Sequence, residues 1–186
     1  MSNKNDLFIG IDGGATSADL ILIDYEGNAI ERSQTKSCNK NNIGFKQATK
    51  NIFDGIQLLL SISKKDIKNI SGICLSTAGI TVNDDKILWN DCIKKWLKSN
   101  GNTNDNIKIE THNDTIGIIA SISPIKLKGI VAIVGTGFIV SGFNGDPNIE
   151  FRCAGYGPLL GDMASGYSMG ESILRSAGTY YDIYCR

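Results

Sequence analysis

The strongest constraint on the fold is a glycine-centred turn between two apolar runs, in the segment FIGIDGGATSADLILID at residues 8–24. The first run ends at Asp12, Gly13 and Gly14 interrupt it, and Thr16 offers a hydroxyl before the second run begins. We expect a strand, a turn and a second strand, with the two glycines permitting positive φ angles and a close backbone approach to a ligand. The turn is therefore a candidate cradle for phosphate.

A second turn of the same design lies in GIVAIVGTGFIVSGF, at residues 129–143. Here Gly135, Thr136 and Gly137 stand between two apolar runs. Either turn alone is equally consistent with an ordinary hairpin, since glycine turns between strands are common. Two such turns on either side of a helical region predict a paired phosphate clamp.

Two other phosphate motifs do not fit these turns. A Walker A loop needs a Lys-Ser or Lys-Thr pair before a helix, and neither turn has the lysine. A dinucleotide fingerprint needs three spaced glycines that open a helix. Residues 18–24 instead continue as a strand, with leucines on one side and isoleucines on the other.

The composition is that of a soluble α/β protein, with 186 residues, 41% hydrophobic content and a formal net charge of zero. Lysines and acidic residues are interspersed, so no basic face points to nucleic acid or to an anionic membrane. The N-terminal MSNKND lacks the apolar core of a signal peptide, and no apolar stretch is long enough to span a bilayer. We therefore expect a cytoplasmic protein.

Cysteine and histidine usage limits the metal chemistry. The five cysteines are scattered without a CxxC pair, which argues against a disulfide framework. Cys74 lies in the apolar run SGICLST, where we expect a small buried core residue. His112 is the single histidine, which excludes a site with several histidine ligands, whereas a hard cation held by carboxylates, phosphates and water is compatible with the sequence.

Apolar periodicity divides the chain into two parts, which we predict to be domains at residues 1–123 and 124–186. The first part begins with an antiparallel meander of three strands and continues with alternating helices and strands. The second part opens with the second glycine turn, which indicates the start of a similarly built domain. The expected strands are 7–12, 18–24, 29–36, 70–76, 107–110, 130–135, 138–143 and an edge strand at 148–153; the expected helices are 45–62, 86–98, 115–123 and 164–177.

Asp114 stands where the strand 107–110 gives way to a helix. Its carboxylate can cap the helix by accepting a backbone N–H. It can equally act as a general base, accepting the proton of a hydroxyl whose oxygen attacks a terminal phosphate. The residues alone leave both interpretations open.

Five segments resemble the sugar kinase and actin-like ATPase superfamily, and within it most closely the N-acetylglucosamine kinases and the related activator ATPases. They span nearly the whole chain and read IGIDGGATSADLILID, LSTAGI, NDTIGIIAS, VAIVGTGFIVSGF and AGYGPLLGDMASGYSMGESILRSA. The resemblance implies an α/β, ribonuclease-H-like (actin-like ATPase) domain with a mixed sheet and flanking helices, plus the start of a second similar domain. It also implies ATP-dependent phosphorylation of an amino sugar, with ATP and Mg²⁺ as cofactors.

The resemblance also implies roles for particular residues. Asp114 would be the catalytic base, and Asp12 would hold Mg²⁺ through water. Phosphate contacts are implied for Gly13, Gly14, Thr16, Gly135, Thr136 and Gly137. Sugar contacts are implied for Asn39, Gly79, Gly155, Tyr156, Gly157 and Asp162, whose amide, backbone and carboxylate groups suit the hydroxyl and N-acetyl groups of a hexosamine.

Four positions depart from the family pattern. Ala15 replaces a third glycine, and its methyl group could hinder the close approach of phosphate. Ser17 and Ala18 stand where a Lys or Arg and a polar residue are typical. Met163 replaces the glutamate that commonly follows Asp162, which loosens the assignment to N-acetylglucosamine itself.

Length is the largest departure from the family. Its members carry a large second domain with an adenosine-binding segment, whereas this sequence ends soon after the last matching helix. We therefore expect a truncated chain, inactive alone, whose apolar faces are covered in a homodimer or by a completing C-terminal polypeptide. Two other functions stay open: a non-catalytic sugar-binding remnant, and an activator ATPase of a dehydratase or reductase in which cysteines hold an iron–sulfur cluster.

Overall fold

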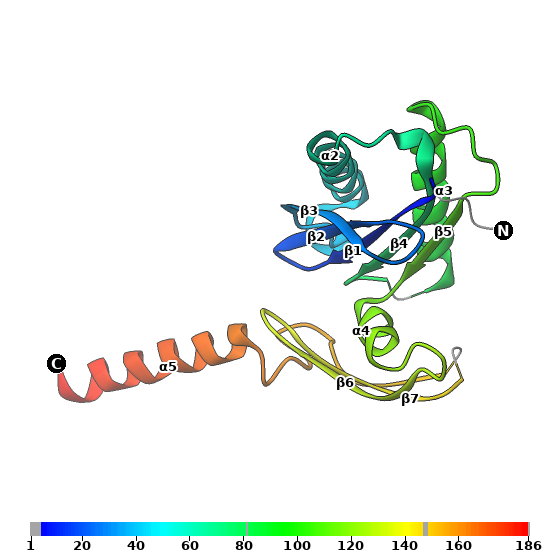
Figure 1. Ribbon diagram of the computed structural model, residues 1–186. Helices are drawn as coiled ribbons and strands as arrows, with labels where there is room; N and C mark the ends of the chain where they lie inside the picture. Colours follow the sequence, from blue (N-terminus) through cyan, green and yellow to red (C-terminus); the bar gives the residue numbers. More distant parts are fainter. Residues whose placement is uncertain (1–4, 81, 147–148, 186) are drawn as a thin grey trace. The chain divides into compact units, whose positions relative to one another are not determined.

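The computed structural model describes residues 5–80, 82–146 and 149–185 (Figure 1). The chain forms two compact units, Met1–Gly117 and Ile118–Arg186, whose division falls inside helix α4 (Asp114–Ile122). We refer to them as unit 1 and unit 2. The domain limits expected from the sequence, 1–123 and 124–186, stay a prediction.

Unit 1 is built on a five-stranded sheet with the order β3-β2-β1-β4-β5. Strands β1, β2 and β3 pair antiparallel, whereas β4 and β5 run parallel to β1. The predicted meander and mixed sheet are thus confirmed, with strands β1 (Leu7–Gly13), β2 (Ser17–Ile23), β3 (Ala29–Lys36), β4 (Ile70–Thr77) and β5 (Lys108–His112).

Two long helices, α2 (Phe45–Ser63) and α3 (Asn83–Ser99), cover one face of this sheet (Figure 1). Their apolar residues recur at helical spacing, so each helix presents a buried stripe to the strands. Both predicted helices are confirmed, and the core cluster joins them to β1, β2 and β4. The short helix α1 (Lys40–Ile43) and the 3-10 turn η1 (Ile67–Asn69) were not predicted.

Cys74 is exposed, so the expectation of a buried core residue was wrong. Side chains alternate between the two faces of a strand. Ile73 and Leu75 on either side of Cys74 are buried under the helices, and Cys74 therefore points to the opposite face of the sheet.

Unit 2 contains a three-stranded antiparallel sheet with the order β6-β7-β8. Its elements are β6 (Lys128–Val134), β7 (Phe138–Asn144), β8 (Glu150–Ala154) and α5 (Gly166–Tyr184). The predicted edge strand is present as β8, although Asn148 at its expected start lies outside the described residues. Helix α5 continues seven residues beyond its predicted end at residue 177, and none of its residues is buried. None of the helices in the described ranges combines the length and apolar character needed to cross a membrane.

Candidate functional site

The first glycine turn joins β1 to β2 without positive φ angles at Gly13 or Gly14, which corrects the reason given for these glycines. A methyl group on Gly13 would collide with Sγ of Cys38 and would lie 2.7 Å from Oγ1 of Thr77. Oγ1 of Thr77 also donates to the carbonyl of Gly13 (3.0 Å). Gly13 is therefore required by close packing inside the protein, not by a left-handed backbone.

The corner of this turn is formed by Ala15 and Thr16. The N–H of Gly14 donates to the carbonyl of Ser17 (2.8 Å), so it is already engaged. The N–H groups of Ala15 and Thr16 have no hydrogen-bond partner among the described residues, and they are the donors that an anion can meet here. Ala15 does not have a positive φ, so its methyl group causes no backbone strain at this turn.

Asp12 lies in a polar row that crosses all five strands of the unit 1 sheet. The strand register places Asp12 beside Asp19 on β2 and beside Ser76 on β4, and it continues to Gln34 on β3 and His112 on β5. The amide of Gln34 donates to Oδ1 of Asp19 (3.0 Å). The row therefore carries two neighbouring carboxylates on the face opposite α2 and α3.

Partial burial raises the pKa of the Asp12 carboxyl above its usual value, and the nearby charge of Asp19 raises it further. A divalent cation would relieve this repulsion, and oxygen ligands suit Mg²⁺. Within the described ranges, no three His, Cys, Asp or Glu side chains converge as a direct metal cage. The carboxylates of Asp12 and Asp19 therefore suit a cation that keeps part of its water shell better than a cation bound by protein ligands alone.

Asn39 and Gly79 face each other at the carboxyl end of β4. Oδ1 of Asn39 accepts from the N–H of Asn41 (3.0 Å) and so caps α1. Gly79 has a φ of 89°, and a methyl group on it would lie 2.6 Å from Oδ1 of Asn39. Both backbone conformation and space therefore require glycine at this position.

Asp114 is the first residue of α4, but Asn113 makes the main cap. Oδ1 of Asn113 accepts from the N–H (3.1 Å) and from Oγ1 (2.9 Å) of Thr115. The Asn113 amide donates to the carbonyl of Ile80 (2.9 Å), which ties the start of α4 to the loop that carries Gly79. Oδ1 of Asp114 accepts the N–H of Thr115 (3.0 Å).

The structure therefore gathers the predicted residues of unit 1 at one edge of its sheet. Strands β1, β4 and β5 are parallel, and the loops after them carry the first glycine turn, Gly79 and Asp114. The side chain of Ser76 donates to the carbonyl of Asn113 (3.1 Å), which links the ends of β4 and β5. Ligands of open α/β sheets bind at the carboxyl ends of parallel strands.

In unit 2, the second glycine turn contacts the loop before α5. The N–H of Gly135 donates to the carbonyl of Gly137 (3.0 Å), and the N–H of Gly166 donates to the carbonyl of Gly135 (2.8 Å). A methyl group on Gly137 would lie 2.9 Å from Oδ2 of Asp162. Asp162 is only 7% exposed, and its Oδ1 has no hydrogen-bond partner within the described part of the chain. The turn, with exposed Thr136 at its tip, and Asp162 thus form one local cluster.

The other predicted residues of unit 2 lie on a loop held by Arg152. Its guanidinium donates to the carbonyl of Gly155 (2.5 Å) and lies over the ring of Tyr156, 5.6 Å from the ring centroid. Gly155 and Gly157 have φ angles of 74° and 87°, which glycine adopts without strain. Ala154, with a φ of 65°, has no such freedom. The contacts of Arg152 and the positive φ angles therefore constrain the conformation of this loop. The side chain of Tyr156 itself is 64% exposed.

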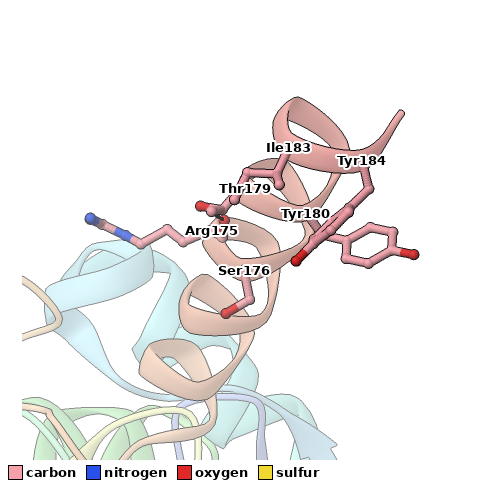
Figure 2. Close-up of a pocket in the computed structure, with 6 residues that line it drawn as sticks. All are labelled: Arg175, Ser176, Thr179, Tyr180, Ile183 and Tyr184. Carbon is pink, nitrogen blue, oxygen red and sulfur yellow. Dashed lines mark hydrogen bonds between the residues drawn. The ribbon is translucent and has the colours of Figure 1, made fainter. Parts of the chain in front are cut away.

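A shallow depression lies elsewhere, along one side of α5 (Figure 2). It is formed by this single helix and contains none of the predicted site residues; its lining comprises Arg175, Ser176, Thr179, Tyr180, Ile183 and Tyr184. The loops around the two glycine turns, each within its own unit, are therefore the candidate binding regions.

Sequence reasoning missed four supporting contacts. Thr77 and Asn113 stand inside the segments LSTAGI and NDTIGIIAS, but the contact of Thr77 with Gly13 and that of Asn113 with Ile80 were not predicted. Arg152 stands shortly before the Gly-Tyr-Gly run. The ion pair of Lys40 with Asp85 (2.9 Å) joins segments far apart in the chain and had no local signal.

The chain is similar to known proteins over nearly its whole length. The model of the BadF/BadG/BcrA/BcrD ATPase family matches residues 9–182. An N-acetyl-D-glucosamine kinase of Dictyostelium discoideum is 34% identical over 179 residues, which cover 92% of this chain and 54% of that protein. An N-acetylmuramic acid/N-acetylglucosamine kinase of Clostridium acetobutylicum is 29% identical over 94% of this chain and 54% of its own length. The chain thus spans about half the length of both relatives.

Two solved structures share the fold at low sequence identity. One, assigned as an N-acetylglucosamine kinase of Chromobacterium violaceum, gives a TM-score of 0.71 at 15% identity and covers 96% of this chain and 59% of its own. The other, assigned likewise, from Porphyromonas gingivalis, gives 0.72 at 23% identity, over 92% and 55% of the two chains. The predicted actin-like ATPase fold is therefore confirmed.

Proposed function

Because the chain belongs to the BadF/BadG/BcrA/BcrD ATPase family, we propose that it serves the ATP-dependent phosphorylation of an amino sugar, with N-acetylglucosamine as the acceptor. Both relatives described above are named as kinases of this sugar. The observation that carries the proposal is the hydrogen bond from the Asn113 amide to the carbonyl of Ile80. It holds Asp114 next to the loop of Gly79, which faces Asn39.

The sugar would be recognised by polar groups that unit 1 already holds in place. Asn39 is fixed by its cap on α1, and Gly79, which is half-buried, lies beside it. Rigid polar groups discriminate well, because a ligand that fails to match them leaves buried partners unpaired. Asn39 and Gly79 are therefore proposed sugar contacts of unit 1. On their own loop in unit 2, Gly155, Tyr156, Gly157 and Asp162 are likewise proposed as sugar contacts.

Asp114 is the proposed general base. As the acceptor hydroxyl oxygen forms a bond to the γ-phosphorus of ATP, its proton passes to the Asp114 carboxylate, and the bond from that phosphorus to the bridging oxygen of ADP breaks. Because Asn113 makes the main cap of α4, the helix start does not depend on Asp114 alone.

Phosphate binding is assigned to the two glycine turns. In unit 1 the exposed N–H groups of Ala15 and Thr16 supply the donors, next to the Thr16 hydroxyl. In unit 2 the corresponding turn is Gly135, Thr136 and Gly137. Asp12 would hold Mg²⁺ through water, and the cation would neutralise charge on the phosphates during transfer.

Helix α5 is the proposed contact for further polypeptide. Its exposed apolar side chains include Ile173 (69% exposed) and Leu174 (75%), and monomeric proteins rarely leave such a continuous surface uncovered. A homodimer or a completing C-terminal polypeptide would bury it. Light scattering across a concentration series would distinguish a dimer from a monomer.

The direct test is transfer of labelled phosphate from ATP to N-acetylglucosamine, with and without a separately supplied C-terminal half from a relative. We expect transfer at least in the complemented reaction. The Asp114→Asn variant should be slower by about 10²–10⁴-fold, the usual contribution of a general base. The matched control is Asp105→Asn, which changes a highly exposed aspartate outside the site.

Two outcomes would overturn the proposal. One is the absence of transfer in both reactions, and the other is an Asp114→Asn rate equal to that of the parent. Sugar binding without transfer or ATP binding would identify a non-catalytic sugar-binding protein.

A further inference from the structure

The ion pair between Lys40 and Asp85 differs from the other ion pairs of the described residues. Nζ of Lys40 lies 2.9 Å from Oδ1 of Asp85, and the two side chains are only 19% and 14% exposed. The pair of Lys50 with Asp54, by contrast, is 66% and 52% exposed and lies within one helix. Shielding from solvent strengthens an ion pair and reduces its screening by salt.

The pair joins helices α1 and α3, each of which adjoins a loop of the candidate sugar site. Lys40 directly follows Asn39, and Asp85 lies in the first turn of α3, the helix that the loop of Gly79 leads into. The two segments also meet at the sheet, where Sγ of Cys38 lies 3.2 Å from Oγ1 of Thr77, the last residue of β4. Asn39 and Gly79 lie between these two connections along their respective loops.

We propose that Lys40 and Asp85 are positioning residues for sugar binding, which hold Asn39 and Gly79 at the spacing that the acceptor requires. The proposal rests on the sugar kinase function proposed above. Neither charge needs to touch the sugar, because the pair acts through the loops.

The chemistry of the pair fits this role. The N-terminal end of α3 favours the negative charge of Asp85, so the helix itself helps to fix one partner. Gly79 approaches Asn39 so closely that a methyl group would overlap with it, which makes the spacing of the two loops sensitive to small displacements. Removing one partner of a shielded pair loses the ionic contact between the two segments and favours their movement relative to each other.

The test compares substitutions at this pair with the same substitutions at the exposed pair. Lys40→Met and Asp85→Asn are each expected to weaken N-acetylglucosamine binding by about tenfold, the effect of losing one shielded ionic contact. They should also speed amide hydrogen exchange in both loops, at residues 37–44 and 77–80. The Lys40→Arg variant should retain affinity, because it keeps the charge. Lys50→Met and Asp54→Asn should leave both quantities unchanged.

The affinity for N-acetylglucosamine and the rate of amide hydrogen exchange together distinguish a failure of the positioning role from a failure of the proposed function. If exchange in the two loops is the same in the Lys40→Met variant and the parent, or if the exposed pair has an equal effect, the positioning role is wrong. If exchange rises in both loops but affinity is unchanged, the pair holds the loops without serving the sugar, and the proposal is also wrong. If the parent chain itself binds no N-acetylglucosamine, the proposed sugar function fails, while exchange still reports whether the pair couples the loops.

Discussion

Unit 1 and unit 2 each carry a glycine turn between two antiparallel strands, yet the surroundings of the two turns differ. Gly13 is buried against Cys38 and Thr77, whereas Gly135 is exposed and has no atom within 4 Å of where a methyl group would stand. The turn of unit 1 is thus shaped by a packed core before any ligand arrives. The turn of unit 2 is held mainly by its contacts with the loop before α5.

The hydrophobic cores of the two units also differ, and the larger one again lies in unit 1. The core cluster of buried residues lies entirely in unit 1, from Leu7 to Leu97. The buried hydrophobic residues described in unit 2 are Ile119, Val131 and Phe143. Similar glycine turns are therefore supported by hydrophobic cores of very different size, and most of the exposed large hydrophobic residues lie in unit 2.

The largest expected effect concerns the core of unit 1. Trp89 is fully buried and packs edge-on against Phe45 (5.0 Å between ring centroids). Trp89→Ala should lower the free energy of unfolding by about 3–5 kcal/mol, because it creates a large cavity. Ile173→Ala on the exposed side of α5 should change it by less than about 0.5 kcal/mol. Urea denaturation measures both, and a large loss at Ile173 would show that α5 is already covered in solution.

The two glycine turns should respond differently to the same substitution. Gly13→Ala should lower the free energy of unfolding by about 1–3 kcal/mol through overpacking. Gly135→Ala should change it by no more than about 0.5 kcal/mol. A Cys38→Ala background should reduce the cost at Gly13, because it removes the sulfur that the new methyl group meets. Equal costs at the two glycines, measured by chemical denaturation, would contradict the proposed difference between the turns.

A smaller effect is expected at Ala154 in unit 2, whose φ is 65°. A left-handed backbone is strained for alanine, so Ala154→Gly should stabilise the protein by up to about 1 kcal/mol. The control is Ala132→Gly in β6, where glycine should destabilise by about 0.5–1 kcal/mol because that strand is extended. Thermal unfolding would report the two opposite signs, and a loss of stability in both variants would refute the strain at Ala154.

The smallest expected effect on stability is electrostatic and arises from the carboxyl group of Asp12. Because its pKa is raised in the folded state, the native protein holds this proton to a higher pH than the unfolded chain does. Stability from this group is complete below the usual carboxyl pKa, and it is lost as pH rises through the raised value. Asp12→Asn should therefore be more stable than the parent at neutral pH, with the difference vanishing in acid.

The control for this prediction is Asp19→Asn, which removes the neighbouring charge and should bring the pKa of Asp12 closer to its usual value. A carbon-13 NMR titration of the carboxyl groups measures that pKa directly. A value at or below the ordinary range in the parent would show that the burial and repulsion at Asp12 have been misjudged.

The fold of unit 1 was largely predictable because its elements carry strong periodicity. Alternating residues marked the meander, and apolar residues at helical spacing marked α2 and α3. Helix α1 was missed because it spans four residues, too few to show a period. Cys74 was misplaced because an apolar run does not reveal which face of a strand is covered.

The site was predictable only in its local parts. The glycine turns and Asp114 stand in recognisable segments, whereas the φ angles expected at Gly13 and Gly14 were wrong. The tight packing of Gly13 depends on Cys38 and Thr77, and the ion pair of Lys40 depends on Asp85. Contacts between such distant segments follow from sheet register and loop placement, which one sequence does not encode in a readable pattern.

The most direct test of the account is to titrate N-acetylglucosamine into isotope-labelled protein and to map the amide shifts by NMR. If the acceptor site is already formed at the edge of the unit 1 sheet, shifts should concentrate in residues 37–41, 77–80 and 113–115, without ATP. Asn39→Ala should weaken these shifts, whereas the exposed control Asn106→Ala should not. Shifts confined to α5, or no binding at millimolar sugar, would contradict the account.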